Sequence, residues 1–213
     1  MPWSLFTLFG NAVFLVPLGA LVCFQIFRQS GVRAGVVWML AFGAGMLAVA
    51  VSKILFYGWG IGVPSLDLTC FSGHTFLALT VWPFVSLLTL QGIMPRLAWL
   101  PGVALGLLVA CSRVGVGAHS VAEVVAGGGL ALSVLAATQI AGRPRPEGLP
   151  GIPNLLLPLM CALPVVGLAF AVTSGRKLPT EHYFSQIGIS LSGADQPMSR
   201  EKWLRRWEDG LRH

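Results

Sequence analysis

The run that decides the fold is Val36–Tyr57, VVWMLAFGAGMLAVAVSKILFY, in which Lys53 is the only charged residue. A helix needs about 20 apolar residues to cross the hydrocarbon core of a bilayer, and this run is long enough to do so. The chain has 213 residues, of which 55% are hydrophobic and 10% are charged. Soluble domains carry roughly 25% charged residues. Disordered chains have low hydrophobicity and high charge, which is the opposite balance. The composition therefore excludes a disordered chain and indicates that lipid is the solvent.

Further apolar runs lie on both sides of this one, separated by charged residues and turn residues. We expect six membrane-spanning helices, over about 3–27, 36–57, 74–90, 97–111, 119–140 and 152–173. The predicted fold class is all-α, a polytopic helical bundle that occupies residues 1–173. Four cysteines, Cys23, Cys70, Cys111 and Cys161, are far apart in the chain, which argues against a zinc site or a disulfide framework.

The segment 174–213 is a polar C-terminal tail of different character. Ser199 is placed to cap a short helix that ends near Gly210. On that helix Trp203, Leu204, Trp207 and Leu211 share one face, a pattern typical of an interfacial amphipathic helix. A loosely ordered basic tail is the alternative interpretation, because helices this short are marginal on their own.

The charges of the loops predict how the bundle is oriented. The chain carries 14 Lys and Arg against 8 Asp and Glu, a net charge of +6. One set of loops holds the arginines Arg28, Arg33, Arg96, Arg143 and Arg145. This set should be cytoplasmic by the positive-inside rule. The other loops and both termini would then face the periplasm or the exterior of a bacterial inner membrane, and Trp38 would lie near the inner interface as part of an aromatic belt.

Polar residues at membrane depth are costly and indicate function. Here the spans bring a few of them to one predicted end of the bundle, namely Lys53, Ser72, Gly73, His74, Ser112, Arg113, His119 and Glu123. Glu123 follows His119 by four residues, so both lie on one helical face. A neutral imidazole can attack phosphorus while a carboxylate orients its other nitrogen. Lysine, arginine and backbone N–H groups can hold the phosphate oxygens, so the set suits phosphoryl transfer.

Two motifs give these residues a family resemblance. Ser112-Arg113-x5-His119-x3-Glu123 resembles the third signature of the type-2 phosphatidic acid phosphatase and haloperoxidase superfamily, with Glu in place of Asp. Phe71-Ser72-Gly73-His74 resembles the second signature, with Phe in place of Pro. The resemblance covers about Lys53 to Glu123, and the six-span layout extends it to most of the chain.

The resemblance implies a phosphatase of lipid phosphates or pyrophosphates that works through a phosphohistidine and without a metal or other cofactor. His119 would be the nucleophile, Glu123 would orient it, and His74 would be the general acid. Lys53, Ser72, Gly73 and Arg113 would bind the phosphate. Its partners would be a lipid phosphate substrate and membrane lipids, and the charge distribution does not call for a nucleic acid.

The first signature departs from the family pattern, which is Lys, six residues, then Arg-Pro. Gly60-Ile61 stands at that spacing after Lys53, so one phosphate-binding cation is missing, and Arg176 or Lys177 is a possible replacement. The departure leaves open a second function, a catalytically degenerate homologue that binds or transports a phospholipid. A third reading, an intramembrane serine protease using Ser72 with His119, explains neither Arg113 nor Glu123.

Overall fold

A computed structural model of the chain describes residues 3–92, 94, 96–141 and 180–210. This part of the chain is all-helical, apart from an isolated bridge between Val63 and Leu68. The elements in order are α1 (Trp3–Leu8), α2 (Ala12–Ser30), α3 (Val32–Trp59), the 3-10 helix η1 (Pro64–Leu66), α4 (Gly73–Leu90), α5 (Leu100–Gly115), α6 (Val121–Ala141), α8 (Thr180–Ser192) and α9 (Arg200–Gly210). The all-α prediction is confirmed for the described residues.

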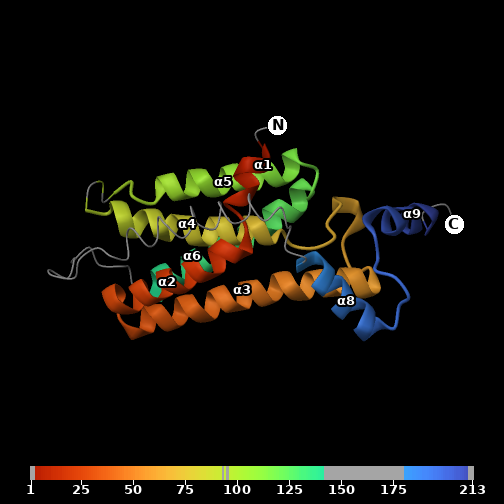
Figure 1. Ribbon diagram of the computed structural model, residues 1–213, viewed down its shortest axis with the longest axis horizontal. Helices are drawn as coiled ribbons and strands as arrows, with labels where there is room; N and C mark the ends of the chain where they lie inside the picture. The colour runs from red at the N-terminus through yellow and green to blue at the C-terminus, as the bar shows by residue number, and fades with distance from the viewer. Residues whose placement is uncertain (1–2, 93, 95, 142–179, 211–213) are drawn as a thin grey trace.

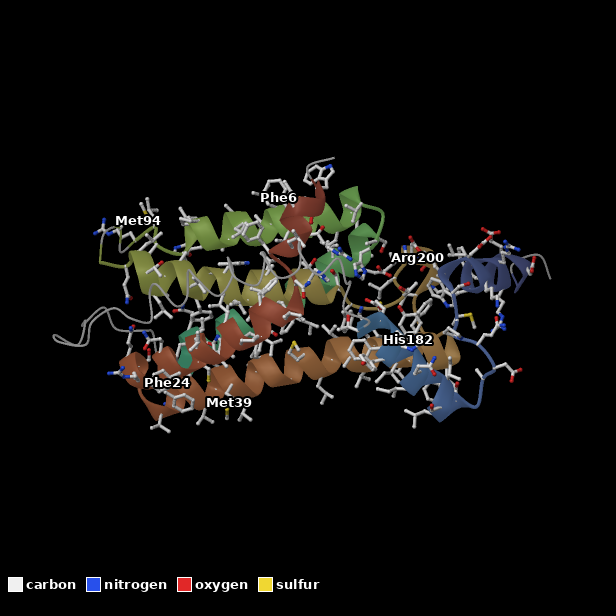
Figure 2. The ribbon with its side chains drawn as sticks, in the orientation of Figure 1. Phe6, Phe24, Met39, Met94, His182 and Arg200 are labelled. Atoms are coloured by element: carbon white, nitrogen blue, oxygen red, sulfur yellow. The ribbon has the colours of Figure 1, made fainter. Side chains whose placement is uncertain are left out.

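Four of these helices, α2, α3, α4 and α6, are long and apolar enough to cross a membrane, and α5 is a shorter apolar helix. They lie side by side along the long axis of the molecule (Figure 1). Large apolar side chains are exposed on the outside of the bundle, among them Phe24 and Met39, which point away from it (Figure 2). An exterior of this kind suits lipid as the solvent. The sixth expected span, 152–173, lies outside the described residues.

The first expected span, 3–27, is wrong in its first third. The helix is interrupted between α1 and α2. The Asn11 side chain caps α2 by accepting a bond from Val13 N (3.0 Å). The Phe9 carbonyl, freed from a helical ladder, accepts a bond from Trp82 Nε1 (2.9 Å). A Cβ at Gly10 would lie 2.6 Å from Val109 and 3.0 Å from His74. The break therefore lets the backbone approach α4 and α5 closely.

The core between α2, α3 and α4 is built around a stack of aromatic rings. Trp38 is only 1% exposed, stacks on Phe42 at 4.7 Å and meets Phe84 edge-on at 6.0 Å. Phe42 in turn stacks on Phe76. The expectation that Trp38 belongs to an interfacial aromatic belt is therefore wrong, because its ring fills the core instead of facing the lipid headgroups.

The bundle has two chemically different ends. At one, the arginine end, Arg28 lies in the last turn of α2, Arg33 in the first turn of α3 and Arg96 in the segment after α4. At the other, the tail end, α8 and α9 lie over the end of α3 and beside the loop 60–72 (Figure 1).

The C-terminal segment is firmly docked at the tail end. Gly188 of α8 packs directly on Gly58 of α3. In α9, the Trp203 ring is buried against Phe56, and its Nε1 donates to the Gly60 carbonyl (2.7 Å). Trp203, expected on a lipid-facing amphipathic surface, thus packs against the protein. The tail contributes two helices to the fold.

Replacing Gly188 with alanine should loosen α8. The added Cβ would lie 2.9 Å from both Gly58 N and Ile54 O, and backbone atoms cannot rotate away. We expect overpacking of about 1–3 kcal/mol, measured as faster protease cleavage within 180–210 and a lower unfolding temperature in detergent. Gly210→Ala, whose Cβ would meet nothing within 4 Å, is the matched control. Equal protease resistance of both variants would contradict the packing.

Candidate functional site

The predicted site residues lie at the ends of four helices that meet at the tail end. Lys53 is in the last turns of α3, and Arg113 is in the last turn of α5. Ser72 caps α4, which begins with Gly73 and His74. His119 lies just before α6, and Glu123 is in its first turn. Residues from separate parts of the sequence therefore gather around one end of the bundle, as the alternation of spans predicts.

A tight turn fixes Arg113 relative to His119. The Arg113 carbonyl accepts bonds from Ala118 N (3.0 Å) and His119 N (3.2 Å). Gly117 has φ +68°, a left-handed conformation that glycine adopts without strain. The five-residue spacing between the two is therefore the length of one closed turn after α5.

His119 and Glu123 form a direct pair. His119 Nδ1 lies 2.6 Å from Glu123 Oε2, and both side chains are buried. When Nδ1 carries the proton that bonds the carboxylate, the lone pair is on Nε2. The pair can therefore present Nε2 as a nucleophile, the geometry expected from the four-residue spacing.

The Glu123 carboxylate is 0% exposed and accepts bonds on both oxygens. Oε1 accepts from Thr69 N (3.0 Å), from the Thr69 hydroxyl and from Arg200 NH2 (2.6 Å). Oε2 accepts from His119 and from Ser120 N (3.2 Å). A buried carboxylate is tolerated only when it is paired and bonded in this way.

The start of α4 is held against α6. Ser72 N donates to the Glu123 carbonyl (3.1 Å), and the Ser72 hydroxyl pairs with Thr75 (2.9 Å). A Cβ at Gly127 would lie 2.6 Å from the Ser72 carbonyl, so only glycine permits this approach. The Ser72 hydroxyl thus bonds Thr75, whereas a serine protease using Ser72 with His119 would need it to bond His119. The first-turn N–H groups of α4, beginning at Gly73, remain the donors that a helix start offers to an anion.

Lys53 is 5% exposed, and its ammonium is paired with the Glu181 carboxylate of α8. Tyr57 donates to the other carboxylate oxygen of Glu181 (2.6 Å). Burial raises the pKa of Glu181, but the charge of Lys53 and the bonds from Lys53 and Tyr57 outweigh it and lower the pKa overall. A half-exposed carboxylate (55%) therefore covers the cation expected to hold phosphate.

Arg113 carries a buried Nε that has no hydrogen-bond partner within the described residues. His74 lies in the first turn of α4 beside Gly10, close enough to Arg113 and Lys53 for their positive charges to act on its imidazole. Ser112, by contrast, bonds to the Val109 carbonyl and to Thr7, so its role is to hold α1 on α5.

Cys70 is the nearest soft side chain, and its sulfur, a His119 nitrogen and a Glu123 oxygen lie within 4.8 Å of one another. Burial raises the pKa of the Cys70 thiol, which favours the neutral form. Both Glu123 oxygens already accept from protein donors. The grouping fits a hydrogen-bonded His–Glu pair with a thiol beside it better than a metal centre.

Four residues of the site escaped the sequence analysis: Tyr57, Thr69, Glu181 and Arg200. Two belong to the tail, where polar residues are too common for one to stand out. Asp67 ends η1 with φ 51°, and its carboxylate accepts a bond from Arg200 (2.9 Å). The suggested donors Arg176 and Lys177 lie outside the described residues.

The tail also fills the space beside the position where the resemblance expects an arginine. That position is Gly60, with φ +70°. A side chain there would start 3.3 Å from Met198 and 3.4 Å from Trp203. The docked C-terminal segment therefore stands where the missing side chain would begin.

Comparison with known proteins finds a bacterial relative. It is a Klebsiella pneumoniae protein described as "Uncharacterized 22.5 kDa protein in cps region", which is 33% identical over 206 residues. The chain belongs to the same family as this protein. The match covers 94% of this chain and 96% of the relative, so the similarity to this relative includes at least part of 180–210. No family model and no solved structure matches the chain.

Replacing Glu123 with alanine should strongly destabilise the tail end. Removing the carboxylate leaves the donors of Thr69, His119 and Ser120 without their acceptor and leaves Arg200 with Asp67 alone, and an unsatisfied buried donor costs about 1–3 kcal/mol. The unfolding temperature in detergent measures the loss. Glu208→Ala, at an exposed position of α9, is the control and should change little. A Glu123→Ala protein as stable as the control would show that the carboxylate is not the anchor described above.

Proposed function

We propose that the chain is an integral membrane phosphatase that hydrolyses a lipid phosphate or pyrophosphate through a phosphohistidine on His119. The observation that carries the proposal is the buried His119–Glu123 pair at 2.6 Å. Glu123 holds Nδ1, so Nε2 is the nitrogen directed to phosphorus. The motif resemblance around Ser72–His74 and Arg113–Glu123 supports the same reaction.

The proposed reaction has two displacements. Nε2 of His119 attacks phosphorus, the bond between phosphorus and the lipid oxygen breaks, and His74 gives its proton to that oxygen. Water then attacks the phosphohistidine, passes a proton to His74 and releases phosphate with neutral His119. Lys53, Arg113 and the N–H groups that begin at Gly73 hold the phosphate oxygens and stabilise the transition state. No metal is required by this scheme.

The proposed setting is a bacterial inner membrane, with six spans and the site facing the periplasm or exterior. Arg28, Arg33 and Arg96 gather at the end opposite the site, which supports a cytoplasmic arginine end. The lipid chains of a substrate would stay in the bilayer while its head group reaches the tail end. Phosphatidic acid, phosphatidylglycerol phosphate, isoprenyl phosphates or pyrophosphates and phosphorylated glycolipids are the substrates to test.

A catalytically degenerate protein that binds or transports a phospholipid is the second candidate. The observation that favours it is the pairing of Lys53 with Glu181, because a carboxylate there competes with phosphate for the same cation. Lipid binding without turnover would support this candidate, and turnover would exclude it.

His119→Ala should abolish phosphate release from the substrate panel, with a loss of about 10³-fold or more because the nucleophile is gone. Vanadate, which mimics pentacoordinate phosphorus, should inhibit the wild type, and EDTA should not. His182→Ala is the matched control, since His182 is exposed on α8 and should keep full activity. Full phosphate release by His119→Ala would contradict the phosphohistidine mechanism.

Glu181→Gln should lower KM for the lipid phosphate, because the neutral amide no longer competes for Lys53. A half-exposed ion pair contributes up to about 1 kcal/mol, so KM should fall by up to about fivefold. Initial rates over a range of substrate concentrations measure it, with Glu208→Gln on the exposed face of α9 as control. A raised KM would instead show that Glu181 helps to hold the substrate.

A further inference from the structure

Arg200 is the residue by which the C-terminal segment reaches the proposed catalytic pair. One guanidinium nitrogen donates to Glu123 Oε1 (2.6 Å) and the other to Asp67 Oδ2 (2.9 Å). Arg200 lies over the loop 60–72 at the tail end (Figure 2). Both terminal nitrogens are thus committed to carboxylates. The contact is therefore suited to hold Glu123 rather than a phosphate.

The protein fixes Arg200 from several sides. The Ser199 hydroxyl accepts from Lys202 N (3.3 Å) at the start of α9. Three residues after Arg200, Trp203 anchors α9 to Gly60. Met198, two residues before it, donates its N–H to the Tyr57 carbonyl (2.9 Å). These contacts determine where the Arg200 side chain starts, so its contact with Glu123 does not depend on a freely moving tail.

The partner on the other side, Asp67, is held in an uncommon conformation. It has φ 51°, and its N–H donates to the Pro64 carbonyl (2.9 Å). It is the only non-glycine residue with positive φ among the residues that the structure describes. A planar fork of two donors between two carboxylates needs arginine, because lysine offers a single charged nitrogen.

From this geometry we infer that Arg200 is a positioning residue for the His119 nucleophile, acting through Glu123; the inference rests on the proposed function. Arg200 and Thr69 hold Oε1, so Oε2 is directed at His119 Nδ1. The guanidinium also offsets the charge of a fully buried carboxylate. The pair is then stable with a neutral imidazole, which is the form that attacks phosphorus.

A positioning role and a phosphate-binding role predict different kinetics. Loss of orientation slows the chemical step, so kcat falls while KM is unchanged. Loss of a phosphate contact in the ground state weakens binding of both substrate and inorganic phosphate. Lys53 and Arg113 are proposed for the second role, and Arg200 for the first.

The experiment uses the full-length protein in lipid nanodiscs, with phosphatidic acid or the panel member that the wild type hydrolyses. We expect Arg200→Gln to lower kcat about 10- to 100-fold, as losses of groups that orient active-site ligands do. KM and the inhibition constant of inorganic phosphate should stay within about twofold. Arg200→Lys should recover part of kcat because it restores one charged donor. Arg205→Gln is the matched control, since Arg205 lies on the same helix and pairs with exposed Glu201.

Trp203→Ala separates positioning from docking, because it releases α9 without touching Glu123. Protease cleavage within 180–210 reports docking in every variant. The inference is supported if Arg200→Gln stays protease-resistant and loses kcat. It is overturned if Arg200→Gln keeps wild-type kcat, if it raises KM and the phosphate inhibition constant together, or if it is cleaved like Trp203→Ala and Arg200→Lys rescues nothing. If the wild-type protein hydrolysed no lipid phosphate of the panel, the proposed function itself would be wrong.

Discussion

The tail end of the molecule depends on one buried negative charge, the carboxylate of Glu123. A carboxylate without exposure is very costly unless donors surround it, and here the donors come from distant parts of the chain. Thr69 lies in the loop before α4, His119 and Ser120 lie before α6, and Arg200 opens α9. Satisfying this one group therefore requires the loop, the bundle and the C-terminal segment to meet at one place.

Lipid as solvent explains why polar chemistry is confined to the ends of the described helices. The exposed surface between the ends is rich in Leu, Val, Ile, Phe and Met, which suits hydrocarbon. Four helices are long and apolar enough to cross it. Charges are tolerated at the ends: Arg28, Arg33 and Arg96 lie at one end, and the ion pairs of Lys53 with Glu181 and of Arg200 with Glu123 lie at the other. The proposed orientation and the proposed site both rest on this separation of charges between the two ends.

The C-terminal segment contributes both to the bonding of Glu123 and to the pairing of charges at the tail end. Its glycine contact with α3 and the burial of Trp203 place Glu181 over Lys53 and Arg200 over Glu123. The tail thus adds one negative and one positive charge to the site. The net charge of the site is unchanged, but Lys53 and Glu123 each gain an ion-pair partner. At Gly60, where the resemblance expects an arginine, the tail packs instead. The residue that departs from the first signature, Gly60, therefore lies where the tail docks.

The sequence by itself was enough to predict an all-helical fold for the described residues, helices long and apolar enough to cross a membrane, and the His119–Glu123 pair. Apolar run length determines the spans, and a four-residue spacing places two side chains on one helical face whatever surrounds the helix. Local sequence did not reveal the break at Asn11 or the burial of Trp38, because both depend on packing against other helices. The same is true of Thr69, Glu181 and Arg200. Their roles follow from which donors and acceptors the folded chain brings into contact across more than 50 residues, and only tertiary structure decides that.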